Sequence, residues 1–152
     1  MPRLKPQHAP AIVIDTREQA PYQFDHPAER RKLDTGDYSI VGLERAVAVE
    51  RKELGDFLNC IGQSRERFER ELERSRGMRR LWVMVEGTLS QIAVGDYRSQ
   101  VTPASVLGTI AAWENRFDAV RICFAGSRSL GQHMTYRLLI RAWMDDIQGA
   151  AA

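Results

Sequence analysis

The hydrophobic residues of the chain fall into short continuous runs and into longer stretches with helical spacing. The short runs, bounded by polar residues, are typical of buried strands. They predict strands at 11–15 (AIVID), 81–86 (LWVMVE) and 119–125 (AVRICFA). Two further β-rich runs, TGDYSIVG (35–42) and LERAVAVERK (43–52), meet at Gly42 and predict an antiparallel hairpin.

Helical spacing of apolar residues predicts helices over about 53–76, 102–117 and 129–146. The first of these segments contains Gly62, where we expect a break. In the second, Thr102 is a typical N-cap and Pro103 a typical first helical residue. The chain therefore alternates helices with strands after its initial hairpin.

This order of elements predicts an α/β fold, with a mixed β-sheet flanked by helices on both faces in a single domain. A length of 152 residues suits one domain with a sizeable core. Residues 1–10, which contain three prolines, are expected to form a flexible lead-in. Residues 11–147 would be the folded domain and 148–152 a frayed tail.

The composition is that of a soluble globular protein. The apolar fraction is 43% and the formal net charge is +2, so the chain is neither disordered nor a polycation. No apolar run reaches membrane-spanning length, and the N-terminus lacks the apolar stretch of a signal peptide. We expect no membrane association and a cytoplasmic location, at the nucleoid in a prokaryote.

Two features of the composition leave the function open. Lys5, Lys32 and Lys52 are the only lysines among 22 basic residues. Arginine suits bidentate phosphate contacts, although genome composition produces the same bias. Cys60 and Cys123 lie far apart, with no Cys or His at ligand spacing, and are expected to be buried free thiols rather than zinc ligands.

The stretch VERKELGD (49–56) places three charges at the end of a predicted strand. Side chains alternate along a strand, so Glu50 and Lys52 share one face, about 7 Å apart at Cα, while Arg51 lies on the other. At this separation, one side chain can hold a metal ion while the other contacts the water that is activated.

Two further carboxylates are expected at the same edge of the sheet. Asp37 begins the neighbouring strand of the hairpin, and Asp15 ends the first strand. Together with Glu50 they would repel one another unless a cation lay among them. Mg²⁺ prefers such oxygen ligands and keeps several waters. It lowers the pKa of a bound water and neutralises charge on a phosphorane-like transition state, so the cluster fits phosphodiester hydrolysis.

Each of these residues also has a structural explanation. A Glu–Lys pair on a strand often serves solubility, Asp37 after Gly36 is typical of a turn, and Asp15 could cap a loop. Only the conjunction of acids at the ends of three apolar strands with one lysine favours the catalytic interpretation. The sequence contains no nucleophile elbow, Walker loop or dinucleotide fingerprint that would favour another chemistry.

The segments IVIDTREQ, TGDYSI, VERKELGDF and RERFERE resemble the nuclease domain of the XPF-type structure-specific endonucleases, whose hallmark is GD…ERKxxxD. The motif is complete here as Gly36-Asp37, Glu50-Arg51-Lys52 and Asp56, and the resemblance extends from about residue 11 to 145. It implies a restriction-endonuclease-like fold and metal-dependent cleavage of DNA near junctions of duplex and single strand.

The resemblance also implies roles for individual residues. Asp37 and Glu50 would bind Mg²⁺, for which Mn²⁺ can substitute, and Lys52 would assist the nucleophile. Asp15 would complete the metal-binding cluster. The implied catalytic set is Asp15, Asp37, Glu50, Arg51, Lys52 and Asp56. Arg17 and Arg67 would lie near the scissile phosphate of the DNA.

The sequence departs from the family pattern in two respects. Members usually carry tandem helix-hairpin-helix modules, and many carry a helicase domain, neither of which is recognisable here. A bare nuclease domain would find branched or flapped DNA through its own surface, a second copy of itself or a partner subunit. Two alternatives stay open: a catalytically inactive DNA-binding or scaffolding subunit, and a Holliday-junction resolvase or restriction-type nuclease on the same fold.

The segment RERFERELERSR (65–76) is rich in arginine, but its acids nearly balance its bases. The pairs at i,i+4 spacing, such as Arg67 with Glu71, are typical of a solvated helix face. We therefore expect most of this helix to be surface, with Phe68 and Leu72 facing the core. Arg67 is the exception, because the resemblance places it beside the active site.

The last predicted helix carries two apolar stripes. The first, expected to face the core, contains Leu130, Met134, Leu138 and Ala142. The second contains Leu139, Trp143 and Ile147. Two stripes indicate either deep burial between neighbouring helices or a dimer interface. The family resemblance favours a homodimer through this helix.

Overall fold

The structure is a computed structural model that describes residues 3–151. Its sheet has six strands in the order β2-β1-β3-β4-β5-β6. The strands are β1 Ile12–Ile14, β2 Ala28–Arg30, β3 Tyr38–Ile40, β4 Val47–Glu53, β5 Arg80–Glu86 and β6 Val120–Phe124. The helices are η1 Pro6–His8 (a 3₁₀ turn), α1 Leu54–Ile61, α2 Arg65–Glu73, α3 Leu89–Val94, α4 Pro103–Arg116 and α5 Arg128–Ala151.

The sheet is mixed, as the sequence predicts. β4, β5 and β6 run parallel and are joined by helical crossovers, whereas β3 pairs antiparallel with both β1 and β4. The predicted hairpin is confirmed, with Tyr38 opposite Val49. The break expected at Gly62 is also confirmed, because this residue is the C-cap of α1 and separates it from α2.

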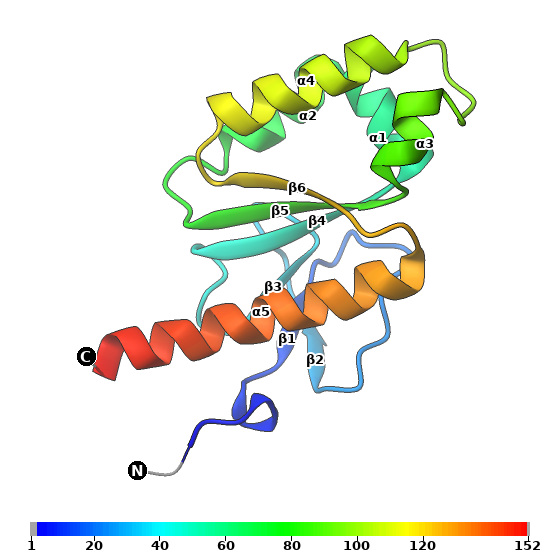
Figure 1. The fold of residues 1–152 in the computed structure, drawn as a ribbon. Coiled ribbons are helices and arrows are strands. Elements are labelled where there is room, and N and C mark those ends of the chain that lie inside the picture. The colour runs from blue at the N-terminus through cyan, green and yellow to red at the C-terminus, as the bar shows by residue number, and fades with distance from the viewer. Residues whose placement is uncertain (1–2, 152) are drawn as a thin grey trace.

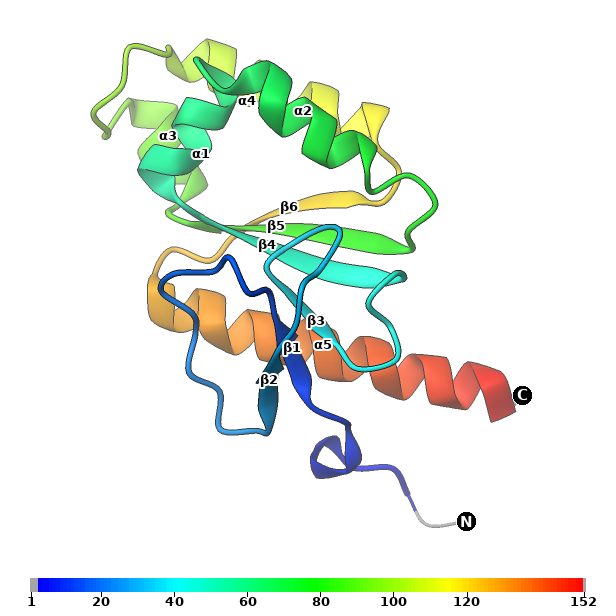
Figure 2. The ribbon, with the colours of Figure 1, turned by 180° about the vertical axis from the view of Figure 1, so that it is seen from behind.

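Helices cover both faces of the sheet, and the sheet separates the hydrophobic core into two clusters (Figure 1). On one face, α1, α2 and α4 pack over β4–β6 around aromatic side chains that include Phe57, Phe68 and Trp113. On the other face α5 crosses β3, β4 and β5, as the reverse view in Figure 2 also shows. Among residues 3–151, no helix is long and apolar enough to cross a membrane.

Two elements were not predicted from the sequence. Strand β2 has the sequence AER and no buried residue, so it carries no apolar signal, and only its pairing beside β1 defines it. Helix α3 is six residues long. It is fixed by a capping box in which the Thr88 hydroxyl accepts from the Gln91 amide and the Gln91 side chain accepts from the Thr88 amide.

Both ends of the described chain contain helical residues. Within the lead-in, residues 6–8 form the turn η1 and Ala9 is buried against the core under α5. In the structure residues 148–151 continue α5, and fraying of this tail stays a prediction. Residues 1–2 and 152, also assigned to these ends, lie outside the described residues.

Helix α5 faces the sheet with a different side from the one predicted. Leu130 and Met134, expected in the core, are 54% and 40% exposed. Leu139, expected at a dimer interface, is fully buried, and Trp143 packs against the same core. The small residue Gly131 decides the orientation, because a Cβ there would lie 2.5 Å from the Tyr22 hydroxyl.

Candidate active site

Strands β3 and β4 bring the acids of the predicted site together. The amide of Asp37 donates to the carbonyl of Val49 at 2.8 Å, which fixes Asp37 beside the end of β4. Gly36 makes this approach feasible: its φ is +84°, and a Cβ would lie 2.7 Å from the Cβ of Ala48. The glycine of the Gly-Asp pair is thus required by the backbone.

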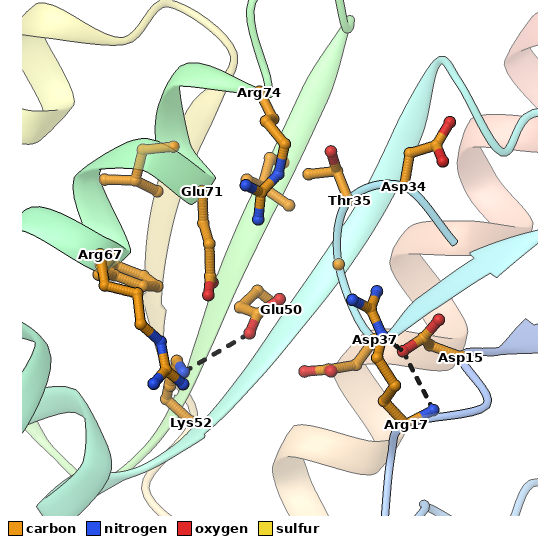
Figure 3. A pocket seen from close by; sticks show the side chains of 14 residues that line it. Asp15, Arg17, Asp34, Thr35, Asp37, Glu50, Lys52, Arg67, Glu71 and Arg74 are labelled. Atoms are coloured by element: carbon orange, nitrogen blue, oxygen red, sulfur yellow. Dashed lines mark hydrogen bonds and ion pairs between the residues drawn. The ribbon is translucent and has the colours of Figure 1, made fainter. Parts of the chain in front are cut away.

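A pocket of about 240 Å³ opens where these strands meet α2 (Figure 3). It is lined mainly by charged and polar side chains. Its lining includes six of the residues predicted for the site: Asp15, Arg17, Asp37, Glu50, Lys52 and Arg67. These six predicted residues therefore lie around one pocket.

Asp37 and Glu50 are the two carboxylates at the centre of the pocket. Burial raises the pKa of Asp37 to about 7, helped by the negative charges of Glu18 and Asp15 and opposed by the Arg51 amide, which donates to its Oδ2 at 2.8 Å. Burial and the neighbouring Asp37 also raise the pKa of Glu50 well above its usual value. Two buried carboxylates of this kind favour a cation between them.

Lys52 lies next to these acids. Its Nζ is 3.6 Å from Glu50 Oε1 and 5.2 Å from the centre of the Phe68 ring. Burial acts to lower the pKa of Lys52, but the negative charge of Glu50 and other acids outweighs burial and raises it. Lys52 is therefore held as an ammonium group at neutral pH.

Asp15 is buried, and both of its oxygens accept hydrogen bonds from the protein. Oδ2 accepts from Arg17 Nε at 2.8 Å and Oδ1 from the Leu33 amide at 2.8 Å. Burial raises the pKa of Asp15, but the hydrogen bonds from Arg17 and Leu33 outweigh burial and lower it. In the structure Asp15 positions Arg17 at the rim of the pocket, and its role as a third metal ligand stays a prediction.

The side chain of Arg51 does not line the pocket. It lies on the α5 face of the sheet, where its Nε and an Nη donate to the two oxygens of Glu86 at 3.0 Å each. The alternation of side chains in β4 requires this placement, as predicted from the sequence, and the catalytic role that the resemblance implies for Arg51 stays a prediction. Only its backbone amide reaches the site, through Asp37.

Asp56 and Arg67 occupy the side of the pocket near α1 and α2. Asp56 does not line the main pocket but an adjoining one of about 290 Å³, which shares Lys52, Arg67, Phe68 and Glu71 with it. Arg67 points toward Lys52 in Figure 3. Among the described residues, no ion pair joins Arg67 to Glu71, although their spacing predicted one.

A model of the ERCC4 domain matches residues 14–138. The chain belongs to the ERCC4 domain family. Its fold is similar to that of XPF from Aeropyrum pernix in complex with DNA, with a TM-score of 0.68, 21% identity and 90% of this chain covered. A second structure, of Aeropyrum pernix XPF, gives a TM-score of 0.62, 20% identity and 85% coverage. A search of curated proteins finds no match.

The ERCC4 match and the fold confirm an XPF-type nuclease domain with a restriction-endonuclease-like sheet. The chain spans 66% and 61% of the two Aeropyrum pernix chains, so it is similar to a part of them. Membership of this family suggests a structure-specific DNA endonuclease.

The donor set of this ERCC4 domain fits a hard cation in part. Among residues 3–151, no group of three Asp, Glu, His or Cys side chains is placed to hold a metal. Asp37 and Glu50 together offer carboxylate oxygens to a metal, but they do not make a full set of protein ligands. Mg²⁺ is commonly held by one or two carboxylates together with water and substrate phosphate, so two carboxylates suffice.

Sequence reasoning missed Glu71 and Arg74. Glu71 is on α2 and Arg74 is its C-cap residue. Both line the pocket, and Figure 3 shows the Glu71 carboxylate directed toward Glu50. The negative charge of Glu71 contributes to the raised pKa values of Glu50 and Lys52. Their spacing from Arg67, four and seven residues, would have placed all three on one helix face.

Proposed function

We propose that this protein is a metal-dependent DNA endonuclease that hydrolyses phosphodiesters at branched or flapped DNA. The observation that supports it is the convergence of Asp37, Glu50 and Lys52 in one pocket, with Arg17 and Arg67 at its rim. A pocket with two buried acids, one ammonium group and flanking guanidinium groups suits a phosphodiester. The family's activity points the same way.

In this proposal Asp37 and Glu50 hold Mg²⁺, with Mn²⁺ as a substitute. The metal, when bound, lowers the pKa of a water and neutralises charge on the reacting phosphate. Lys52 keeps its protons because of Glu50, so its Nζ acts as a hydrogen-bond donor that orients water or phosphate.

The flanking arginines would bind the DNA backbone. Arg17 is held at the rim by Asp15, and one of its Nη atoms donates to the Leu33 carbonyl at 2.8 Å. Guanidinium groups that are fixed in this way bind phosphate with little further loss of freedom. Contacts to phosphate do not distinguish one base sequence from another, so a preference for junctions would come from DNA shape.

The experiment is cleavage of labelled fork, flap, four-way junction and linear duplex DNA with Mg²⁺ or Mn²⁺. We expect cuts near the branch of fork or flap. Lys52→Ala and Asp37→Asn should abolish cleavage and leave the fold intact, because these groups serve the reaction rather than the core. Lys32→Ala is the matched control, since Lys32 is exposed and does not line the pocket.

The other outcomes separate the alternatives. Binding of forked DNA without cleavage under either metal would indicate an inactive scaffolding subunit. Cleavage of the four-way junction alone would indicate a resolvase, and cleavage of linear duplex at specific sequences a restriction-type enzyme. Full activity of Lys52→Ala would refute the proposed catalytic set.

The proposal includes a homodimer or a partner subunit. The predicted interface stripe is largely covered by the chain's own core, as Leu139 and Trp143 show. The exposed large apolar side chains of α5 are those of Leu130, Met134 and, from the predicted stripe, Ile147. Leu130 and Met134 lie one helical turn apart, so we propose that an assembly through α5 uses this side of the helix.

A further inference from the structure

We propose that Glu86 and Tyr22 are positioning residues for the metal-binding carboxylate of Asp37. They act from the opposite face of the sheet, through Arg51. This inference rests on the proposed function, because it assigns Asp37 to the metal. It gives a role in the reaction to groups that lie outside the pocket.

The side chains of Arg51, Glu86 and Tyr22 form a closely connected cluster under the N-terminal part of α5. Arg51 and Glu86 make a bidentate pair with two N···O distances of 3.0 Å, and their side chains are only 9% and 7% exposed. The Tyr22 hydroxyl donates to Glu86 Oε2 at 2.7 Å, and its ring lies 5.5 Å from the Arg51 guanidinium. The Arg51 guanidinium is thus fixed in position and in orientation.

The backbone of the same residue holds Asp37. The Arg51 amide donates to Asp37 Oδ2 at 2.8 Å. Between this amide and the guanidinium there is only the Arg51 side chain, and the next residue on either side, Glu50 or Lys52, enters the pocket. Any rotation of the peptide plane before Arg51 would therefore move the Asp37 carboxylate and the Glu50 side chain together.

The cluster is in turn anchored to α5. Gly131 approaches so closely that a Cβ would lie 2.5 Å from the Tyr22 hydroxyl and 3.6 Å from Glu86 Oε2. The Arg128 guanidinium lies over the Tyr22 ring, 5.1 Å from the ring centre, and donates to the Ala20 carbonyl at 2.8 Å. The start of α5 therefore holds the side chains of Tyr22 and Glu86 in place beside Arg51 of β4.

A purely stabilising role would not require this chemistry. A buried ion pair generally adds little stability compared with well-packed apolar side chains. The bidentate geometry instead restricts direction, and reacting groups are sensitive to displacements of about 1 Å, which can cost about 100-fold in rate. The cluster holds the same residue, Arg51, whose amide contacts Asp37. The restricted orientation of Arg51 therefore acts on the Asp37 carboxylate in the pocket.

The test compares Glu86→Gln and Tyr22→Phe with a matched control, Glu69→Gln. Glu69 resembles Glu86, since it also accepts from an arginine, Arg65, and from an aromatic donor, the Trp113 indole. Glu69 contacts neither Asp37 nor β4. Amide hydrogen exchange of Arg51, measured without metal or DNA, is the first readout, with the Val83 amide in β5 as the internal reference.

We expect Glu86→Gln to accelerate exchange at the Arg51 amide at least about tenfold more than at Val83, and Tyr22→Phe to do so to a smaller extent. With forked DNA, both variants should lower kcat, Glu86→Gln by about 10- to 100-fold, with KM for DNA unchanged. The Glu69→Gln variant should alter neither the exchange ratio nor kcat.

The inference is overturned if Arg51 stays as protected as in the wild type, or if exchange rises equally at both amides. It is also overturned if kcat is retained while the Arg51 amide is exposed. Exchange needs no cleavage, so a wild type that cuts no DNA would refute the proposed function, while the exchange ratio would still decide whether the cluster holds the Arg51 amide.

Discussion

Replacing Asp37 with asparagine should stabilise the metal-free protein at neutral and alkaline pH. The pKa of Asp37 is raised from 3.8 to about 7 by burial. A difference of about 3 in pKa, at about 1.4 kcal/mol for each unit, corresponds to about 4 kcal/mol as an upper limit. The asparagine Oδ1 can still accept from the Arg51 amide. Relaxation around the carboxylate reduces the effect, so we expect a gain of about 1–3 kcal/mol.

The sign follows from proton binding. Between pH of about 4 and about 7 the folded protein holds a proton on Asp37 that the unfolded chain has lost, so wild-type stability falls as pH rises through this range. Asparagine does not titrate. The difference in unfolding free energy between Asp37→Asn and wild type should therefore be small near pH 4, grow toward pH 7 and not decrease above it.

Urea denaturation in the presence of a chelator measures this difference. Titrating groups that do not interact with Asp37 act in both proteins and cancel in the difference. Glu50 does not cancel, because the charge of Asp37 raises its pKa; losing that charge in Asp37→Asn adds stability in the same direction. Asp96→Asn, a change at an exposed aspartate that does not line the pocket, is the matched control. Added Mg²⁺ should stabilise the wild type and not Asp37→Asn. A difference that is independent of pH, or an asparagine variant less stable than wild type at alkaline pH, would refute the reasoning.

Three further predictions concern other parts of the fold. Gly36→Ala should lower the unfolding free energy by about 2 kcal/mol or more in urea titration, because φ is +84° and the new Cβ would meet Ala48. Glu71→Gln should strengthen metal-free binding of DNA at low salt by several-fold in fluorescence anisotropy, since it removes a negative charge from the pocket, whereas Glu66→Gln, on the exposed side of α2, should change it less. In sedimentation, the wild type should be a dimer at micromolar concentration and Met134→Glu a monomer; a wild-type monomer would point to a separate partner subunit.

The alternation of side chains in β4 was the part of the site that could be predicted most directly. Period-two spacing puts Glu50 and Lys52 on one face, and the hairpin at Gly42 brings Asp37 beside them. Both features are local, so a single sequence contains them. The position of Arg67 beside the site could be predicted only from the family resemblance, because the charge pattern of its helix is typical of a solvated surface.

What sequence could not predict depends on packing between distant segments. Helix α5 was oriented wrongly because hydrophobicity favoured Leu130 and Met134, whereas the close approach of Tyr22 selects Gly131 for the sheet side. The far-face partner of Arg51, Glu86, is 35 residues away in the chain. No spacing rule connects two such residues in parallel strands.

The division of β4 between two faces restricts how the length of this chain can change during evolution. One residue inserted after Val49 would turn Glu50 and Lys52 toward α5 and bring the Arg51 side chain to the pocket. Two inserted residues would restore the faces but move Glu50 about 7 Å along the strand, away from Asp37. Insertions in the loop between α3 and α4 would disturb neither face. Members of the family should therefore differ in length in such loops, and β4 should keep the same number of residues in all that retain the Glu-Arg-Lys sequence.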